Sequence, residues 1–382
     1  MKVSVVRCFT YREEEVLKSV KEAVDLIGGI EKFVKPNSKI LLKVNLLSAR
    51  SPEKAVTTHP EIVRAVVRLV KERGGIPLIG DAASTGGMGL SLKREDAFRI
   101  AGFREIAEHE GAEIVNFNSA GYRKVSIPQS KRLKEVNLAI PVFEVDAIFS
   151  LPKLKTHELT FLTGAVKNFF GCIPASDRNI AHRAIDPRDF ARAVVDIYSL
   201  CRPSLSIMDG ITAMEGEGPS RGYPFSLGVV LASPSAVALD VVASQLIGYK
   251  PAEIYTTVEA IERGLGPEGL EKIEVLGAPL KELIRRDFKK PSGYRSLTRR
   301  TIYRILAPLG IRFFKVYPAA DKRKCKKCGL CEERCPVEAI KLEPYPVIDY
   351  EKCIQCFTCH EVCEYEAMDL KRSWLARTFS SQ

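Results

Sequence analysis

Short apolar runs alternate with amphipathic stretches along the first 275 or so residues. Apolar positions at helical spacing predict a helix over 13–26, and the runs 3–8 and 39–46 on either side of it read as buried strands. Thr58-His59-Pro60-Glu61 has the spacing of a capping box before the amphipathic stretch 62–75, and the apolar run 76–81 follows. Strand, loop, helix and strand within about 40 residues form a βαβ unit, which predicts a parallel sheet.

The same alternation continues beyond this unit. We expect helices over 103–111, 189–200 and 236–248, and strands over 112–117, 145–152, 205–210 and 227–233. The segment from Gly210 to Pro219 is rich in glycine and is predicted to be a loop that approaches a ligand. The fold class is therefore α/β, a mostly parallel sheet with flanking helices.

The composition of the chain changes after Lys281. Residues 295–317 are basic and amphipathic but are interrupted at Pro308. We interpret the segment as a connector that faces solvent or an acidic redox partner, and peripheral membrane contact is the less favoured alternative. The expected organisation is an α/β domain over 1–282, a basic connector over 283–320, a small α+β domain like a bacterial ferredoxin over 321–372 and a tail over 373–382.

The last of these domains carries two copies of C-x2-C-x2-C-x3-C, and together they hold eight of the eleven cysteines. This spacing is typical of two-cluster bacterial ferredoxins, in which the fourth cysteine of each copy binds the cluster of the other copy. Two 4Fe-4S clusters are therefore predicted. The ligands of cluster 1 would be Cys325, Cys328, Cys331 and Cys363, and those of cluster 2 would be Cys353, Cys356, Cys359 and Cys335.

Zinc and disulfides explain this cysteine pattern less well. Structural zinc sites usually pair two C-x2-4-C units around one ion. Disulfide frameworks belong to secreted chains, and the start MKVSVVRC does not resemble a secretory leader. The two copies differ in the residue after their fourth cysteine. Pro336 follows Cys335 in the first copy, and Glu364 follows Cys363 in the second. The change removes no ligand.

Composition limits the remaining classes of function. The chain has a net charge of +11, but residues 283–327 hold fifteen Lys and Arg against two Asp, so the rest of the chain sums to about −2. The basicity therefore belongs to one segment, and we expect no nucleic-acid partner. No run of eighteen apolar residues is present, and the iron-sulfur motif suits a reducing, anaerobic cytoplasm.

Polar side chains follow several predicted strands at the place where open α/β sheets bind ligands. Candidate proton-handling residues are His157, with Asp81 or Asp209. Candidate groups for an anionic ligand are the basic and amide side chains at the strand ends and in the segment after His157, together with one loop carboxylate: Lys43, Asn45, Lys153, Lys155, Lys167, Asn168 and Glu215. For Asn45, Asp81 or Asp209 taken singly, an ordinary turn or capping role is an equally weighted alternative. The stretch from Lys153 to Gly171 is harder to explain in this way.

No short fingerprint of a familiar cofactor site is present. The sequence has no G-x-G-x-x-G after its first strand, no G-x-x-x-x-G-K-[ST] and no nucleophile elbow. Nicotinamide and nucleoside triphosphate chemistry are therefore not supported. A flavin stays open as a further cofactor, because flavin sites often lack a short motif.

The stretches KILLKVNLL with TTHP, IGDAAS, SLPKLKTHELTFLTGAVKNFFG, MDGITAMEGEGP and CIQCFTCHEVC resemble the domain of unknown function family 362, in the form with a C-terminal two-cluster ferredoxin domain. The resemblance covers nearly the whole chain and implies iron-sulfur binding and redox work. A more distant likeness is to the amino-terminal domain of lactate racemase. Because that family's own motifs are absent, no metal site is carried over.

Two functions fit these observations. The first is a cytoplasmic iron-sulfur oxidoreductase that passes low-potential electrons to an anionic substrate or second cofactor at the strand ends. The second is an electron carrier or reductive activator that docks on a partner protein and has no substrate chemistry of its own.

Overall fold

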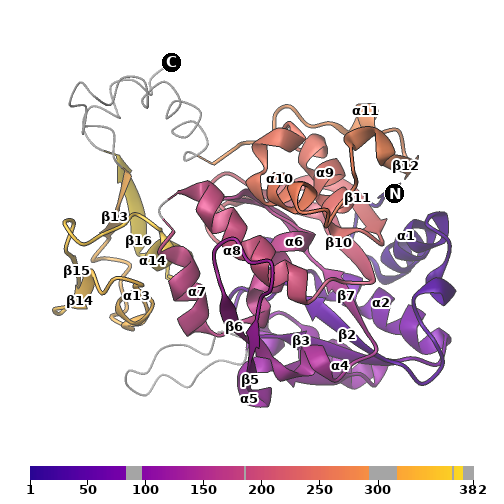
Figure 1. Cartoon of the computed structure of the whole chain (residues 1–382), viewed down its shortest axis with the longest axis horizontal. Coiled ribbons are helices and arrows are strands. Elements are labelled where there is room, and N and C mark those ends of the chain that lie inside the picture. The colour runs from indigo at the N-terminus through magenta and orange to yellow at the C-terminus, as the bar shows by residue number, and fades with distance from the viewer. Residues whose placement is uncertain (83–96, 185, 292–315, 364, 373–382) are drawn as a thin grey trace.

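The computed structural model describes the chain except for residues 83–96, 185, 292–315, 364 and 373–382. Figure 1 shows a large α/β part, and beside it a smaller C-terminal part coloured in yellow. The α/β part is built on a ten-stranded sheet whose main path runs β12-β1-β11-β10-β7-β2-β3-β4. The predicted α/β fold class is confirmed.

All strands of this path run parallel to one another except β11. β8 pairs with β10 and with β9, off the main path. The strands of the sheet are β1 (Lys2–Arg7), β2 (Lys39–Val44), β3 (Ile76–Asp81), β4 (Glu113–Asn116), β7 (Ala147–Leu151), β8 (Lys153–His157), β9 (Phe161–Thr163), β10 (Leu205–Glu215), β11 (Tyr223–Ser233) and β12 (Glu274–Gly277). A separate hairpin joins β5 (Tyr122–Ser126) to β6 (Glu135–Ala139).

Helices cover both faces of the sheet. One face packs against α1 (Glu13–Leu26), α2 (Pro60–Glu72), α3 (Ala97–Ile100) and α4 (Phe103–Glu110). The other face packs against α6 (Ala165–Asn168), α7 (Ala175–His182), α8 (Pro187–Leu200), α9 (Ala236–Leu246) and α10 (Tyr255–Glu262). The short helices α5 (Phe117–Ala120) and α11 (Leu280–Leu283) lie in connections.

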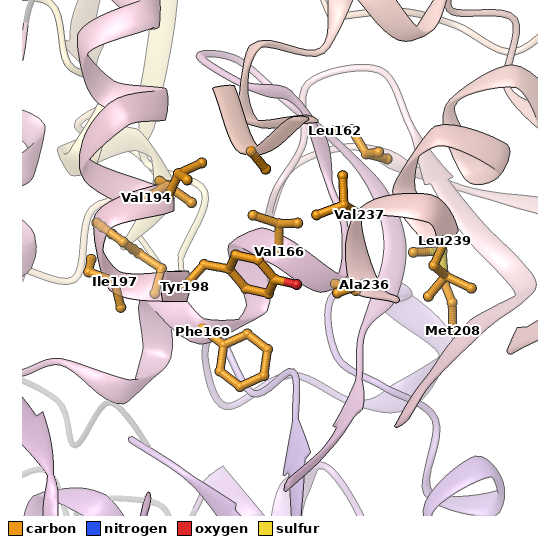
Figure 2. Close-up of a cluster of buried hydrophobic side chains, with 14 of the residues drawn as sticks. Leu162, Val166, Phe169, Val194, Ile197, Tyr198, Met208, Ala236, Val237 and Leu239 are labelled. Atoms are coloured by element: carbon orange, nitrogen blue, oxygen red, sulfur yellow. The ribbon is translucent and has the colours of Figure 1, made fainter. Parts of the chain in front are cut away.

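Strand β2 shows why its sequence is almost continuously apolar. Ile40 and Leu42 belong to the core under α1 and α2, whereas Leu41 belongs to the core on the opposite face. A central parallel strand buries both faces, so successive side chains alternate between two apolar cores. Figure 2 shows part of the second core, where Phe169 and Tyr198 pack beside Val166 and Ala236.

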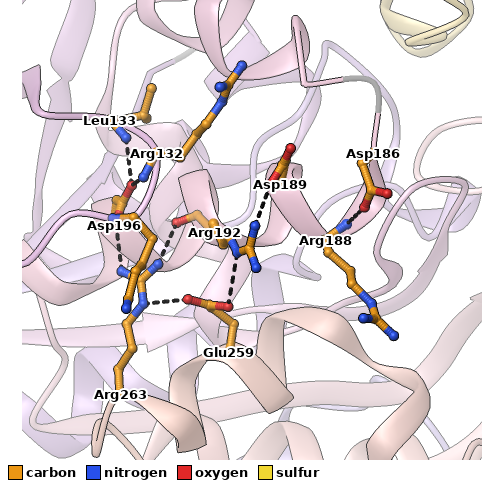
Figure 3. A network of polar contacts seen from close by, with 10 residues as sticks. Arg132, Leu133, Asp186, Arg188, Asp189, Arg192, Asp196, Glu259 and Arg263 are labelled. Atoms are coloured by element: carbon orange, nitrogen blue, oxygen red, sulfur yellow. Dashed lines mark hydrogen bonds and ion pairs between the residues drawn. The ribbon is translucent and has the colours of Figure 1, made fainter.

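The polar face of that helical layer is held by a network around Asp196, a buried carboxylate on α8 (Figure 3). Its oxygens accept hydrogen bonds from the backbone N–H groups of Arg132 and Leu133 and from the Arg263 guanidinium, at 2.8, 2.7 and 2.6 Å. Arg263 also pairs with Glu259 at 2.7 Å. The network ties the loop after β5 to α8 and to the end of α10.

Two local predictions were wrong. His59, not Thr58, is the N-cap of α2, because the Thr58 hydroxyl donates to the Leu151 carbonyl oxygen while His59 Nδ1 accepts from the Glu61 N–H. The loop expected from Gly210 begins only after Glu215. Residues 212–215 pair with 223–226 of β11 beyond a bulge at Gly210, so β10 is twice as long as its apolar run suggested.

The C-terminal part is small and α+β, as predicted. It contains β13 (Val316–Ala320) paired with β16 (Met368–Arg372), β14 (Ile340–Leu342) paired with β15 (Pro346–Ile348), and the short helices α13 (Leu330–Glu333) and α14 (Thr358–Glu361). Among the described residues of the whole chain, no helix has the length and apolarity needed to span a bilayer.

Three arginines of the α/β part bind carbonyl oxygens of the C-terminal part. Arg50 donates to Cys363 at 3.4 Å, Arg183 to Pro336 at 3.0 Å and Arg221 to residue Glu366 at 3.2 Å and to Met368. Guanidinium groups are strong multiple donors, so these contacts orient one part on the other. We call the three residues the arginine latch.

Candidate functional site at the strand ends

The carboxyl ends of the parallel strands lie along one edge of the sheet, and the predicted polar residues gather there. Asn45 follows β2, Asp81 ends β3, Lys153 begins β8 just after β7, and Asp209 lies in β10 opposite Lys153. The expectation that these positions share one edge agrees with the observed topology. They nevertheless form three separate groups with different partners.

The first group centres on Lys153 and Asp209, which are both fully buried. The Lys153 ammonium donates to Asp209 Oδ2 at 2.7 Å and to the Tyr11 hydroxyl at 2.9 Å. Tyr11 donates to Asp209 Oδ1 at 2.8 Å, and its ring stacks on that of His59 at 3.5 Å. Burial lowers the pKa of Lys153, and the adjacent Asp209 carboxylate opposes that change. The charge of Lys153 is thus balanced by a carboxylate of the same chain.

The second group pairs Lys43 with Asp81 at 3.0 Å. Asp81 Oδ2 also accepts the Leu46 N–H at 2.8 Å, and the Asn168 amide donates to the Lys43 carbonyl oxygen at 2.9 Å. A Cβ on Gly171 would lie 2.6 Å from Asp81 Oδ1, so only glycine lets the chain pass this close to the pair. The Asn45 amide donates to Asn168 Oδ1 at 3.4 Å. Lys43, Asn45, Asp81 and Asn168 are thus brought together in one network, in which Asn45 Oδ1 has no hydrogen-bond partner among the described residues.

The third group lies on β8 and faces the C-terminal part. Lys155 and His157 are completely buried, and the Lys155 ammonium donates to the Val56 carbonyl oxygen at 2.6 Å. Burial and the neighbouring Lys167 ammonium both depress the pKa of Lys155 well below its usual value. His157 Nδ1 accepts the N–H groups of Leu159 and Thr160, at 3.0 and 3.3 Å. The imidazole hydrogen therefore belongs on Nε2.

His157 Nε2 points at a residue that we did not predict, Glu361 of α14. Nε2 and Glu361 Oε1 are 3.3 Å apart, without the alignment of a hydrogen bond. Glu361 stands between Cys359 and Cys363 of the second cysteine motif, so a carboxyl group of the C-terminal part enters the α/β site. Burial raises the pKa of Glu361 to about 7 against the opposing influence of Lys167.

Lys167 and the unpredicted His182 join His157 around two phenylalanine rings. The Lys167 ammonium lies 5.3 Å from the ring centre of Phe170 and 6.0 Å from that of Phe190. The His182 ring lies 5.6 and 4.7 Å from the same two rings, and the His157 ring lies 6.3 Å from Phe190. Burial, opposed by Glu361, lowers the pKa of Lys167 to about 8. Burial and the nearby Lys167 lower that of His182 to about 3.

A further arginine completes this group. Arg178 precedes His182 by one turn of α7, and its charge contributes to the lowered pKa values of both His182 and Lys167. We call the set of five side chains the basic cluster, and its members are Lys155, His157, Lys167, Arg178 and His182. By contrast, the predicted ligand group Glu215 lies apart from this cluster. Its carboxylate accepts the backbone N–H of Lys289 at 2.8 Å and anchors the start of the connector.

The residues predicted to hold the clusters have surroundings that fit iron-sulfur ligation. A pocket is lined by the four cysteines assigned to cluster 1, with Leu330 and Met368 among its walls. Backbone N–H groups point at three cysteine sulfurs, from Lys327 to Cys325, from Ala339 to Cys335 and from Ala367 to Cys363. Such bonds stabilise thiolate ligands. All eleven cysteines are free.

The sequence offered only weak signals for the residues that were missed. Glu361 is a charged residue inside a cysteine motif, but Glu333 occupies the same place in the first copy, so the sequence does not single it out. Arg178 and His182 occur at i and i+4 on α7, a spacing that puts them on one face. Neither signal indicates which distant residues these side chains contact in the folded protein.

Family models match two stretches of the chain. The model of a family described as "Domain of unknown function (DUF362)" matches residues 40–245, and two models described as "4Fe-4S binding domain" match 318–341 and 345–368. A thylakoid-associated protein of Synechocystis sp. is 33% identical over 291 residues, 76% of this chain and 87% of that protein.

A solved structure was also matched, the lactate racemase apoprotein from Thermoanaerobacterium thermosaccharolyticum. It has a TM-score of 0.40 and 10% identity, over 62% of this chain and 55% of the racemase chain. This chain therefore spans little more than half of the racemase. The matched family model contains the strand-end residues described above except Tyr11 and Glu361, and the two cluster-binding models contain all eight motif cysteines.

Proposed function

The chain belongs to the family described as Domain of unknown function (DUF362) and binds two 4Fe-4S clusters, and from this premise we propose that it is an iron-sulfur oxidoreductase. In this proposal it passes low-potential electrons to an anionic substrate or second cofactor at the strand ends of the α/β domain. The bound clusters would supply one-electron transfer. The residues of the chain would position the substrate and handle protons.

One observation carries the proposal, the 3.3 Å approach of Glu361 to His157. Glu361 is two residues from Cys359 in one cluster set and two residues from Cys363 in the other. A side chain this close to both sets of ligands therefore lies against the imidazole that we propose as the proton-handling group. The arginine latch supports the same arrangement, because it holds the cysteine-bearing backbone on the α/β domain.

Within the site, the three groups would act differently. We propose that Lys43 with Asp81, and Lys153 with Asp209, fix the strand ends as internal pairs. The acceptor would then bind at the basic cluster, where His157 presents Nε2–H toward the second domain. A flavin at this position is supported only by the absence of the sequence motifs for nicotinamide and nucleoside triphosphate binding.

An external electron donor would dock near the first cysteine motif. Basic side chains are exposed on both sides of the half-buried Cys325, and they are Lys322, Arg323, Lys324, Lys326 and Lys327. A positive surface next to a cluster suits an acidic redox protein, because opposite charges steer encounter. The same surface favours the second candidate function, an electron carrier or reductive activator with no substrate of its own.

We propose a cytoplasmic location, as expected for a redox protein with clusters of this kind. The similar protein from Synechocystis sp. is named for its association with thylakoids. The segment 295–317, considered above for membrane contact, lies outside the described residues except for 316–317.

The deciding experiment begins with anaerobic purification, iron and sulfide analysis, and an absorption spectrum. We expect about eight irons per chain. Protein reduced with dithionite is then mixed with the small-molecule fraction released from a denatured sample, and cluster reoxidation is followed by absorbance. The enzyme proposal expects reoxidation by this fraction without any other protein.

The matched variants are His157→Ala and His109→Ala, because His109 is exposed on α4. We expect His157→Ala to abolish substrate-dependent reoxidation while the cluster spectrum is unchanged, and His109→Ala to behave as the wild type. Equal reoxidation in both variants would remove the proposed role of His157. Reoxidation only after a partner protein is added would establish the carrier function instead.

A further inference from the structure

We propose that the basic cluster contains a subsite for an oxyanion, a carboxylate or phosphate group, held by Lys167, Arg178 and His182. The inference rests on the proposed function only in assigning this group to the electron acceptor. The existence of the subsite follows from the side chains themselves, and two of its three residues were not among the predicted ligand groups.

The geometry brings the subsite together from two helices. Lys167 on α6 and His182 on α7 both lie against the rings of Phe170 and Phe190, at 4.7 to 6.0 Å from the ring centres. Arg178 lies four residues before His182, and residues at this spacing share one face of a helix. A lysine and an imidazole thus converge on an aromatic wall, and the charge of Arg178 is near enough to lower the pKa values of both.

These groups lack the partners that buried polar groups normally have. Within the described ranges of the chain, Lys167 and Arg178 form no hydrogen bond and no ion pair, although both are half-buried. The His182 side chain is only 4% exposed, and its Nδ1 has no hydrogen-bond partner. Keeping cations and a ring nitrogen unpaired away from bulk water is costly unless a ligand satisfies them.

The charge balance points to the same ligand class. Burial depresses the pKa values of Lys155 and Lys167, and nearby cations lower them further, Lys167 for Lys155 and Arg178 for Lys167. Glu361 is the carboxylate of the second domain that opposes both depressions. Asp81, the other carboxylate in range of Lys155, already pairs with Lys43. Positive charges that are gathered without enough carboxylates favour an anion, and arginine with lysine is the usual pair for carboxylate or phosphate oxygens.

The contrast with Lys153 shows that the arrangement is not a general property of this edge. Lys153 is fully buried, and it is matched by Asp209 and by the Tyr11 hydroxyl at 2.7 and 2.9 Å. The two lysines that we propose to be structural, Lys43 and Lys153, therefore each have an aspartate as a partner. The basic cluster was left with an excess of donors, and the two phenylalanine rings add a surface for the apolar part of an organic anion.

The subsite can be tested by isothermal titration calorimetry on the oxidised holoprotein under anaerobic conditions. The probes are sodium sulfate, a tetrahedral dianion, and sodium malonate, a dicarboxylate, at constant ionic strength. We expect one anion to bind per chain, and the tighter of the two probes identifies the group as phosphate-like or carboxylate-like. Arg178→Gln and Lys167→Gln should each weaken binding at least tenfold.

The matched control is Arg202→Gln, because Arg202 is exposed and precedes β10 at the opposite edge of the sheet. This variant should bind as the wild type does, and the cluster spectrum reports that each variant is folded. The inference is overturned if the wild type binds neither probe, or if Arg202→Gln weakens binding as much as Arg178→Gln. The titration uses oxidised protein and no electron donor, so it tests the subsite alone. Anion binding here, together with no reoxidation in the separate assay on dithionite-reduced protein, would defeat the proposed function and leave the subsite standing.

Discussion

Four lysines at the strand ends look alike in the sequence but fall into two kinds in the structure. Lys43 and Lys153 each contact an aspartate, at 3.0 and 2.7 Å. The ammonium of Lys155 binds only a carbonyl oxygen among the described residues, and that of Lys167 only faces aromatic rings. The first pair hold the sheet edge together, and the second pair face the ferredoxin domain.

The difference teaches how to separate structural from functional charge in a buried site. A paired lysine stabilises the fold, because removing its partner leaves an uncompensated charge. An unpaired lysine costs stability, so a protein retains it for another reason. By this criterion, the place to look for a ligand is the basic cluster and not the pair of Lys153 and Asp209.

The largest expected effect is on the paired group. Asp209→Ala should lower the free energy of unfolding by about 3–5 kcal/mol, because it strands the buried Lys153 charge. Lys167→Met should change it by less than about 1 kcal/mol, since no ion pair is lost. Urea unfolding of the anaerobic holoprotein, followed by circular dichroism, measures both. Similar losses in the two variants would erase the distinction between the two kinds of lysine.

A smaller effect is expected where the two domains meet. Glu361→Gln keeps the shape of the side chain and removes the carboxylate that opposes Lys155 and Lys167. We expect sulfate to bind about tenfold more tightly, as calorimetry of the holoprotein would show, because one anionic competitor is gone. Glu332→Gln on α13 is the control, since Glu332 is exposed. Unchanged or weaker sulfate binding in Glu361→Gln would contradict an electrostatic role for Glu361 at the subsite.

The smallest effect is a pH dependence of several-fold. The pKa of Lys167 is lowered to about 8 by burial, so this lysine is charged below pH 8 and neutral above it. Sulfate affinity should therefore be greatest below pH 8 and should fall as the pH rises through that value. The titratable and charged groups around Lys167 come from β8, α7 and α14, and they are Lys155, His157, Arg178, His182 and Glu361.

The control for this titration is Lys167→Gln, whose weaker affinity should stay flat between pH 7 and 9. Sulfate is the suitable probe, because it does not itself change charge in that range. An identical slope in the wild type and in Lys167→Gln would assign the pH dependence to another group.

Features that depend on neighbours in sequence were predictable here. The cysteine spacing implied two clusters, and the period of apolar residues located β2, α2 and β3 within a few residues. The strand-end rule then placed Lys43, Asp81, Lys153 and Asp209 along one edge. Each of these inferences uses a local pattern together with a general rule of architecture.

Features that depend on which distant elements meet were not predictable. The pairing of Lys153 with Asp209 requires β8 to lie beside β10, and their sequence separation of 56 residues carries no signal of it. Glu361 acquires its partner His157 only when the ferredoxin domain docks. The length of β10 was missed for the same reason, since its second half is stabilised by pairing with β11 and not by an apolar pattern.

The arginine latch has a consequence for how such a protein evolves. Arg50, Arg183 and Arg221 donate mainly to main-chain carbonyl oxygens, which every amino acid provides. Most side chains on the facing surface can therefore drift without loss of these bonds. Glu361 is different, because its carboxyl group and not its backbone contacts His157. A related ferredoxin module could be exchanged for this one through gene fusion if it kept a carboxylate at this position and the few other side chains that meet the arginines, such as His360.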